Sequence, residues 1–403
     1  MREGARASVA GIAPVQMYSI ADYGAMIQDT ARIDGFIRAF RRVITPDTVV
    51  VDIGTGTGIL ALLACQLGAR RVYAIEPDDS IHVAREAAAA NGYADRVEYL
   101  QALSTAITLP EQADLIVSDI GGVLPWLQHH VPTIVDARTR FLAPGGTLIP
   151  RRDTLWMALV EAPDLYRKHA EPWDAHPYGL DLTSARRLVV NTWRQGRISK
   201  EQLLTPLARP VSVDYAEVTS SNLDAAVRWT VARSGTAHGF GAGIDRLLIE
   251  GVGFSNAPEC VDRLPPDSIY RTAFFPWSSP VSLVTGDVVT IELRAVLVGD
   301  DYVWNWKATV LDQGLTDRVK ARFDQSTLYG VPMSAAQLHK RSASHVSTLN
   351  EDGTLTSLTL ELMRLSMPLR EIAGRLLERF PSRFPDSHRA LTYVSDLSQR
   401  YSQ

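Results

Sequence analysis

Three glycines alternate with threonines directly after a short apolar run. The run is Val49–Val51, and the glycines are Gly54, Gly56 and Gly58. Glycine lets the backbone approach a ligand closely and adopts φ angles that other residues avoid. A helical apolar pattern begins at Ile59, and its first turn would direct free N–H groups and the positive end of the helix dipole at that ligand. The sequence therefore predicts a strand–loop–helix site for a nucleotide-like cofactor.

The spacing of the glycines distinguishes two kinds of cofactor. The fingerprint of a nicotinamide site is G-x-G-x-x-G, but Ile59 stands where its third glycine would be. Asp52 precedes Gly54 by two residues. Its negative charge would repel a pyrophosphate and attract the ammonium of a methionine moiety. A nicotinamide-dependent oxidoreductase is therefore the weaker alternative.

Two further acidic residues follow predicted strands. Glu76 ends the run 72–75, and Asp119 ends the run 113–118. In a doubly wound fold, an acidic side chain after the second strand reaches ribose hydroxyls, and ligands bind at the carboxyl ends of the strands. We expect Glu76 to bind a ribose and Asp119 to face the ligand. The alternatives are a solvated loop carboxylate for Glu76 and a helix cap for Asp119.

The elements that must position these residues alternate regularly. Apolar runs predict strands at 49–51, 71–75, 97–100, 113–118 and 147–150, with a turn at 144–146. Helical patterns cover 59–67, 81–90 and 131–141. This alternation is typical of an α/β fold with a doubly wound, mostly parallel sheet.

The alternation of strand and helix patterns ends at about residue 155. Short β-like runs occur at 188–190, 227–231, 247–249, 281–283, 288–297 and 303–310. They predict an antiparallel β-barrel or sandwich. Helical patterns return from about residue 338. The expected organisation is 1–45 as N-terminal lid helices, 46–154 as the cofactor domain, 155–330 as the barrel acceptor domain and 338–403 as a small helical or winged-helix module.

Five segments resemble the protein arginine methyltransferase family. They are Met26–Arg32 with Phe36, Val51–Leu60, Leu142–Pro150, Gly253–Pro258 and Phe274–Asp287. The resemblance spans roughly residues 18–310 and implies S-adenosylmethionine as the cofactor, with Arg32 binding its methionine carboxylate. The cofactor site it implies consists of Met26, Arg32, Asp52, Gly54, Thr55, Gly56, Gly58, Glu76, Pro77, Ser104 and Asp119.

The segment expected to bind the acceptor departs from this family. The family carries two glutamates that hold a guanidinium, and the matching residues are Asp119 and Gln128. Its Thr-His-Trp loop corresponds to 268–270, Ser-Ile-Tyr. One carboxylate is thus shortened and the other is replaced by a neutral amide, whereas a guanidinium requires charge-assisted hydrogen bonds. The acceptor predicted from these changes is a smaller or neutral nucleophile: an amine that can lose its proton, a hydroxyl or a carboxylate.

Candidate catalytic roles follow from these positions. Asp119 would orient the acceptor or accept its proton, and Gln128 would bind a neighbouring carbonyl or carboxylate. His238 is a further candidate proton acceptor, the alternative being a structural histidine in a β-turn. The acceptor itself belongs to a peptide, a protein or a small molecule. The rival function is a non-catalytic scaffold of the same fold that binds a peptide or protein partner.

The C-terminal segment resembles a second family. Residues 350–353 and 368–380 are similar to small winged-helix domains of peptide natural-product pathways, such as pyrroloquinoline quinone biosynthesis. That resemblance implies a leader peptide bound along a strand edge, and the alternative is a helical domain that packs on the barrel or on a partner. Residues 338–403 hold nine Lys or Arg and seven Asp or Glu. This near balance does not favour nucleic acid.

Composition limits the remaining classes. The 403 residues carry a net charge of −4 and two cysteines, so neither nucleic acid, an anionic membrane nor a disulfide framework is expected. No apolar run reaches the roughly 18 residues of a membrane span, no signal peptide is evident, and a cytoplasmic enzyme is expected. His129 and His130 lack ligands at metal-binding spacing and are expected to be exposed helix residues, so no metal is predicted. The irregular residues 164–206 stand where the resembled family forms its dimerisation arm, which implies a homodimer.

Overall fold

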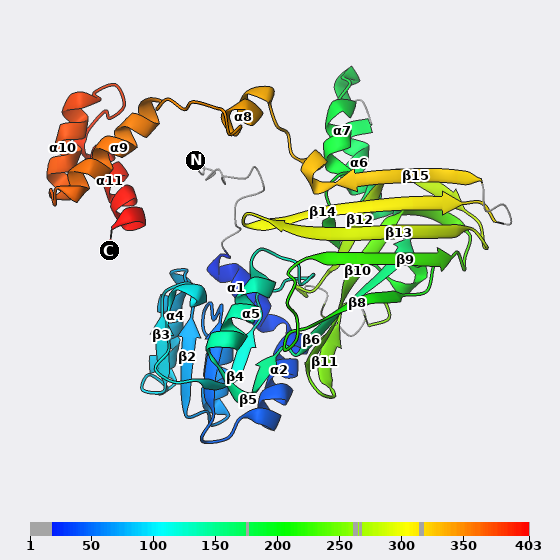
Figure 1. Cartoon of the computed structure of the whole chain (residues 1–403), viewed down its shortest axis with the longest axis horizontal. Coiled ribbons are helices and arrows are strands. Elements are labelled where there is room, and N and C mark those ends of the chain that lie inside the picture. Colours follow the sequence, from blue (N-terminus) through cyan, green and yellow to red (C-terminus); the bar gives the residue numbers. More distant parts are fainter. Residues whose placement is uncertain (1–17, 175–176, 261–264, 266–267, 314–317, 403) are drawn as a thin grey trace. The chain divides into compact units, whose positions relative to one another are not determined.

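The computed structural model describes residues 18–174, 177–260, 265, 268–313 and 318–402. The chain divides into two compact units, Met1–Pro332 and Met333–Gln403. The first unit contains one parallel sheet and two antiparallel sheets (Figure 1). The second unit contains helices.

The parallel sheet is the predicted doubly wound sheet. Its strands are β1 (Val49–Ile53), β2 (Arg71–Ile75), β3 (Val97–Leu100), β4 (Ala113–Ser118) and β5 (Leu142–Ile149), in the order β3-β2-β1-β4-β5. The connections carry α3 (Ile59–Gln66), α4 (Ser80–Ala90), η1 (Ser104–Ala106) and α5 (His130–Arg140). All five residues of β1 are buried, as expected where helices cover both faces of a parallel sheet. Strand order reverses between β1 and β4, which places a ligand-binding crevice at their carboxyl ends.

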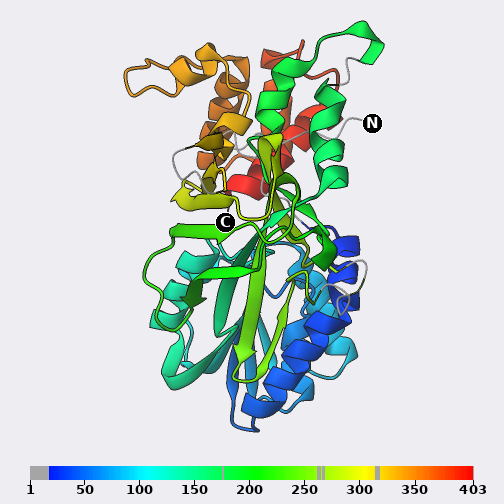
Figure 2. The ribbon, with the colours of Figure 1, turned by 90° about the vertical axis from the view of Figure 1, so that its right-hand side faces the viewer.

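Among the described residues, two helices precede the sheet, within the segment predicted to form the lid helices. The first is α1 (Ile20–Gln28), capped by Ser19, and the second is α2 (Thr30–Val43), capped by Asp29. Helix α2 buries Phe36 and Phe40 in a core cluster that also contains residues of α3 and β10. Figure 2 shows α2 (blue) beside the hairpin of β10 and β11. Helix α1 buries no residue, so it is fixed by a few polar contacts rather than by a core.

The predicted antiparallel domain consists of two sheets. The first contains β6 (Arg152–Val160), β7 (Arg194–Gly196), β8 (Ala208–Asp214), β10 (Gly235–Ile249), β11 (Val252–Ser255) and β12 (Thr272–Leu283). The second contains β9 (Leu223–Thr230), β13 (Val288–Val298), β14 (Asp301–Leu311) and β15 (Val319–Ser326). One core cluster joins Val51 of the parallel sheet to Phe275 and Trp306 of these sheets. The cofactor domain and the barrel therefore share a core.

Three local predictions are wrong. The β-like run 188–190 mostly belongs to a helix, α7 (Thr183–Val189). The segment predicted as irregular contains α6 (Pro163–Asp174), α7, the short turn η2 (Pro177–Gly179) and η3 (Lys200–Gln202). A three-residue apolar run is too short to show its period, and here the helical pairing of α6 with α7 decides its structure. The turn predicted at 144–146 lies inside β5, where Gly145 has a φ of 80° and the register against β4 shifts.

The second unit is a small helical bundle. Its helices are α8 (Ala335–Lys340), α9 (Glu351–Arg364), α10 (Leu369–Arg379) and α11 (Ser387–Tyr401). Its own core contains Leu355, Ile372, Leu376 and Val394. The helical character of this module is therefore confirmed. A winged helix needs a β-hairpin, and residues 333–402 contain no strand, so the strand edge that was expected to hold a leader peptide is not found among them.

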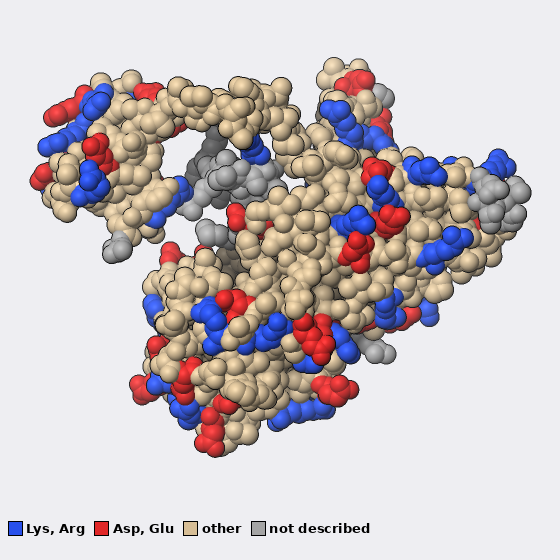
Figure 3. All heavy atoms as spheres, in the orientation of Figure 1, with Lys and Arg blue, Asp and Glu red and all other residues tan. Residues whose placement is uncertain are grey.

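Two global features complete the description. Within the described parts of the chain, no helix combines the length and the apolar character needed to cross a membrane. On the visible face of the first unit, basic and acidic side chains are interspersed (Figure 3).

Candidate active site

The residues predicted to bind the cofactor gather at one edge of the parallel sheet. Loops 54–58, 76–79 and 119–129 follow β1, β2 and β4, and Ser104 follows β3. Because the strands are parallel, these carboxyl ends all lie at the same edge. The last of these loops, residues 119–129, is called the acceptor loop below.

The glycine loop has no room for side chains. Gly54, Gly56 and Gly58 all have left-handed φ angles, of 75°, 55° and 88°. A Cβ atom on Gly56 would lie 2.4 Å from Cε1 of Tyr23, and one on Gly54 would lie 2.3 Å from Cγ2 of Ile120. Glycine is therefore required both by conformation and by the close approach of α1 and the acceptor loop.

Glu76 is held by the backbone of the glycine loop. Its Oε2 accepts a hydrogen bond of 3.0 Å from the N–H of Gly56, and its Oε1 accepts one of 3.0 Å from the N–H of Asp78. Burial raises the pKa of this carboxyl. Each carboxylate oxygen can accept two hydrogen bonds, so both oxygens keep an acceptor position that suits the two hydroxyls of a ribose.

Asp52 lies deeper in the same site. It is buried at the end of β1, and its Oδ2 accepts a hydrogen bond of 2.6 Å from Oγ1 of Thr55. Burial raises the pKa of Asp52 to about 7. A cation beside this carboxyl would restore its ionised form, which matches the ammonium expected there.

The two lid helices meet over this edge. In α1, the hydroxyl of Tyr23 lies 3.3 Å from Oγ of Ser80, and the half-buried Met26 has its carbonyl 3.3 Å from Nη1 of Arg32. At the junction, Asp29 accepts hydrogen bonds from the hydroxyl of Ser268 at 2.6 Å and from a neighbouring backbone N–H. The lid is thus fastened on one side to the parallel domain and on the other to the barrel.

Two cofactor candidates lie at the margin of the site. Pro77 is exposed beside Glu76. Ser104 is buried in η1, where its carbonyl accepts a 2.7 Å hydrogen bond from Arg140. Their roles toward the cofactor stay predictions.

Asp119 accepts hydrogen bonds from three donors. Nε of Arg32 lies 2.5 Å from its Oδ2, Nη1 of Arg246 lies 2.7 Å from its Oδ1, and the hydroxyl of Tyr270 donates to the same Oδ1. Burial opposes ionisation of this carboxyl, but Arg32 and Arg246 outweigh it and hold the pKa of Asp119 below its usual value. A general base works best with a pKa near the working pH, so this geometry weighs against Asp119 as a proton acceptor.

Arg246 belongs to a buried chain of polar groups. Its Nε and Nη2 donate to the two carboxylate oxygens of Asp153, at 2.8 and 2.7 Å. Asp153 also accepts a 2.7 Å hydrogen bond from the hydroxyl of Tyr215, which lies 2.9 Å from Nε2 of His130. Because the hydroxyl of Tyr215 donates its one hydrogen bond to Asp153, it accepts a hydrogen bond from Nε2–H of His130. Burial and Arg246 lower the pKa of His130 to about 4, so the ring is neutral.

Of the other two catalytic candidates, Gln128 lies in the acceptor loop and His238 lies far from it. Gln128 lies in the acceptor loop with a left-handed φ of 44°, and its backbone N–H donates to Asp301 at 3.4 Å. His238 is a correction: it lies in strand β10, not in a β-turn, and its ring packs 5.5 Å from that of Tyr166. It precedes Arg246 by eight positions, which at about 3.3 Å per residue puts it roughly 26 Å along the strand from Arg246. His238 therefore lies far from Asp119.

The two adjacent histidines also separate. His129 is exposed, as predicted, with Nε2 3.3 Å from Oδ1 of Asp300. His130 was predicted to be exposed but is buried, because it is the first residue of α5 and faces Tyr215. Among the described residues, no three potential ligand side chains form a group that could hold a metal ion.

Sequence reasoning missed Arg246, Asp153 and Tyr215. The signal that could have drawn attention to the first is a lone arginine beside the apolar run 247–249. In a predicted buried strand, such a charge must find a partner. The partner itself could not be named without the register of β6 against β10.

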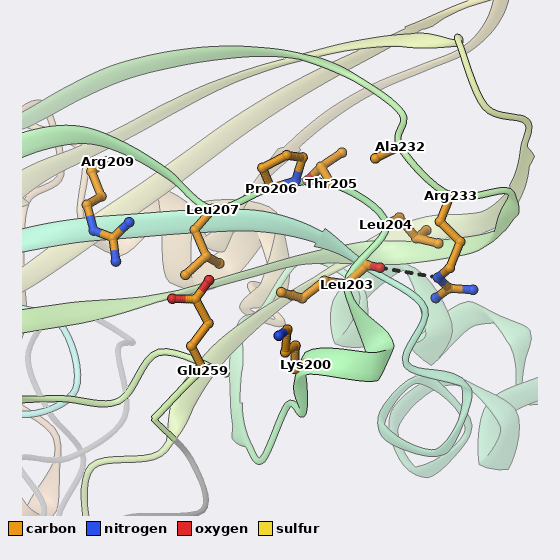
Figure 4. A pocket seen from close by; sticks show the side chains of 10 residues that line it. All are labelled: Lys200, Leu203, Leu204, Thr205, Pro206, Leu207, Arg209, Ala232, Arg233 and Glu259. Atoms are coloured by element: carbon orange, nitrogen blue, oxygen red, sulfur yellow. Dashed lines mark hydrogen bonds between the residues drawn. The ribbon is translucent and has the colours of Figure 1, made fainter.

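A separate pocket lies in the barrel. It has a volume of about 390 Å³ and is lined by ten residues, including Lys200, Leu203, Pro206 and Glu259 (Figure 4). Nε of Arg233 closes one side by donating to the carbonyl of Leu203 at 3.3 Å. None of the predicted site residues lines this pocket.

Comparisons with known proteins agree with this geometry. The family model described as ribosomal protein L11 methyltransferase (PrmA) matches residues 33–151. Protein arginine N-methyltransferase 1 of Chlamydomonas reinhardtii is 27% identical over 218 residues, 53% of this chain and 63% of that protein. The probable protein arginine N-methyltransferase 6 of Arabidopsis thaliana is 34% identical over 165 residues, 40% of this chain and 38% of that protein. This chain thus resembles the protein arginine methyltransferases.

Solved structures show the same fold. The PRMT1 enzyme–prozyme heterotetrameric complex with AdoHcy from Trypanosoma brucei has a TM-score of 0.66 and 21% identity, and the match covers 75% of this chain and 96% of that one. Protein arginine methyltransferase 10 of Arabidopsis thaliana, in an open conformation, has a TM-score of 0.66 and 20% identity, covering 77% and 98%. The predicted fold, a class I methyltransferase domain followed by an antiparallel barrel, is confirmed.

Proposed function

We propose that this chain is an S-adenosylmethionine-dependent methyltransferase. Its acceptor is a nitrogen or oxygen nucleophile of a peptide or protein side chain or of a small molecule. The proposal rests on the position of Glu76 at the edge of the parallel sheet. The backbone of the glycine loop holds its carboxylate near Tyr23, and both oxygens can still accept a further hydrogen bond. The matches to named methyltransferases support it.

Three charged groups of the site would each have a partner in this cofactor. Glu76 would bind the ribose hydroxyls, Asp52 the ammonium and Arg32 the carboxylate of the methionine moiety. The cofactor supplies a methyl group on a cationic sulfur, which a nucleophile displaces directly. The chain contributes alignment and exclusion of water, which are the main sources of rate for such a transfer.

The lid helix α1 would provide the exclusion of water. It buries no residue of its own, and Tyr23 meets Ser80 and Gly56 at the rim of the site. A helix held by so few contacts can open at small cost. Cofactor entry through movement of α1 is therefore part of the proposal.

The test combines binding with transfer. Purified protein should bind S-adenosylhomocysteine in calorimetry, and Gly56→Val should abolish binding while the protein stays folded, because a side chain there meets Tyr23. Labelled S-adenosylmethionine and lysate of the native organism should then yield a labelled acceptor. A folded wild type that binds neither S-adenosylmethionine nor S-adenosylhomocysteine would contradict the proposal.

One observation favours a second function. Asp119 is the carboxylate that an active enzyme would use to bind the methyl acceptor, and three donors of the chain already bind it. This is expected of a scaffold that no longer transfers methyl groups. Such a scaffold would bind S-adenosylhomocysteine but label no acceptor in the same experiment, and it would recover a stable protein or peptide partner instead.

We also propose that the chain forms a homodimer through the arm of α6 and α7. Both helices project from the barrel on the side away from the parallel sheet (Figure 1). Between them, Tyr178 is 98% exposed and Leu180 is 59% exposed. Apolar side chains at the tip of a projecting arm suit insertion into a second protomer.

A further inference from the structure

The carboxylate of the acceptor loop already holds a guanidinium. Arg246 donates from Nη1 to Oδ1 of Asp119 at 2.7 Å, and the hydroxyl of Tyr270 donates to the same oxygen. Arg32 donates to Oδ2 at 2.5 Å. When Arg32 turns to the carboxylate of the cofactor, as the proposed function requires, Asp119 still has Arg246 and Tyr270 as donors.

Arg246 cannot move aside for another cation. Asp153 lies directly opposite it in the register of β6 against β10 and binds it through two parallel hydrogen bonds. Both side chains are fully buried, and Tyr215 holds Asp153 from behind. A two-pronged pair of this kind fixes orientation as well as charge.

The acceptor loop is shaped around this pair. A Cβ atom on Gly121 would lie 2.9 Å from Nε2 of His130 and 3.1 Å from Nη2 of Arg246. Glycine at this position therefore lets the loop lie directly on the buried guanidinium. The contact closes the space between Asp119 and the network behind it.

The charges of the buried cluster are balanced before the cofactor binds. The buried cluster contains two carboxylates, Asp119 and Asp153, and two guanidinium groups, those of Arg32 and Arg246. Gln128, the other residue of the acceptor loop that matches a guanidinium-binding position, carries no charge. When Arg32 turns to the cofactor, Asp119 still shares its charge with Arg246 and accepts from Tyr270. An acceptor with a permanent positive charge would therefore lie in a water-poor site beside the like charge of Arg246 and would have to share Asp119 with it.

We propose that Arg246 determines the acceptor specificity of this site. Its guanidinium occupies the position beside Asp119 that a cationic acceptor would need. The reaction is thereby restricted to acceptors without a permanent positive charge: a hydroxyl, a carboxylate or a neutral amine. The inference rests on the proposed methyltransferase function. Specificity here comes from exclusion of the wrong ligand as much as from attraction of the right one.

The test removes the internal guanidinium without leaving a charge unpaired. In the double variant Asp153→Asn with Arg246→Met, the amide keeps an acceptor for Tyr215 and the flexible methionine fills the space. The probe is a short arginine–glycine peptide, titrated by calorimetry into protein saturated with S-adenosylhomocysteine. We expect no measurable binding to the wild type and at least tenfold tighter binding to the double variant.

A matched control pair joins the neighbouring position of β10 to strand β8. Arg209 and Asp245 form an exposed pair at 2.6 Å, with Asp245 beside Arg246 on β10. Asp245→Asn with Arg209→Met removes the same two charges from the surface and should leave peptide binding unchanged. A double variant of the buried pair that binds S-adenosylhomocysteine normally yet gains no affinity for the peptide would overturn the inference and leave the proposed function standing.

A second measurement needs only the wild type. The same peptide with citrulline in place of arginine has a neutral side chain of nearly the same shape. The wild type should bind the arginine peptide no more tightly than the citrulline peptide. A tenfold preference for arginine would overturn the inference, whereas loss of S-adenosylhomocysteine binding by the wild type would overturn the proposed function itself.

Discussion

The raised pKa of Asp52 predicts that cofactor binding depends on pH. Burial raises this pKa to about 7, so the free protein carries a mixture of the neutral and the ionised acid near neutrality. Only the ionised form attracts the ammonium of the methionine moiety. Affinity for S-adenosylhomocysteine should therefore rise as the pH rises toward the pKa, and fall as acid neutralises Asp52.

The size of the effect follows from the ionised fraction. With a pKa of about 7, about one-tenth of the carboxyl is ionised at pH 6 and about half at pH 7, which corresponds to about a fivefold change in Kd, or roughly 1 kcal/mol. An α-amino group titrates near 7.7–8.0 and stays mostly charged in this range. His130, with a pKa of about 4, is neutral throughout and does not contribute.

Calorimetry can separate this cause from others. Titrations near pH 6 in two buffers with different ionisation enthalpies should show release of roughly one proton per bound ligand. Asp52→Asn should bind more weakly and lose both the proton release and the pH dependence, whereas Gln in place of the neighbouring Glu76 should retain them. A wild-type affinity that is flat or falls between pH 6 and pH 7 would refute the reasoning.

Three further predictions concern single features. Glu76→Ala should weaken S-adenosylhomocysteine binding by about 1–3 kcal/mol. Glu98→Ala, at an exposed position of the edge strand β3, should change it by less than about 0.5 kcal/mol, and equal effects of the two variants would place the ribose elsewhere. Arg246→Met should lower the free energy of unfolding by about 3–5 kcal/mol, because Asp153 stays buried without its partner, and adding Asp153→Asn should recover at least half. Urea titration with tryptophan fluorescence measures this, since all eight tryptophans precede residue 333, and no recovery would contradict the pairing. Tyr178→Asp should give a monomer by light scattering at micromolar concentration, and an unchanged dimer mass would remove the arm from the interface.

The cofactor half of the molecule was predictable because its signals are local. Residues 49–58 contain a strand and the loop that leads into a helix. The apolar residues identify the strand, and the alternating glycines identify the loop. The same holds for the helices 81–90 and 369–380. Where a run was short, as at 188–190, its period could not distinguish strand from helix, and packing decided.

The acceptor side was not predictable because its contacts are distant in sequence. Arg246 and Asp153 are 93 positions apart, and Asp119 and Arg246 are 127 apart. Their contact depends on the register of β6 against β10 and on the sheet edge where β4 ends. The resemblance to the protein arginine methyltransferases indicated that Asp119 and Gln128 form an incomplete guanidinium site, but only the fold shows that Arg246 of the chain itself contacts Asp119.

The hydrogen bond from Ser268 to Asp29 spans 239 positions of the chain. During synthesis, the glycine loop and the whole parallel sheet leave the ribosome more than a hundred residues before Ser268 does. Domains generally form from the N-terminus as they emerge, so the lid of the nascent cofactor domain is attached for a time only to the parallel domain, through Tyr23 and Ser80. The lid gains its second attachment only when the strand after Ser268 joins the barrel, so a chain truncated before that strand would hold the lid by its contacts with the parallel domain alone.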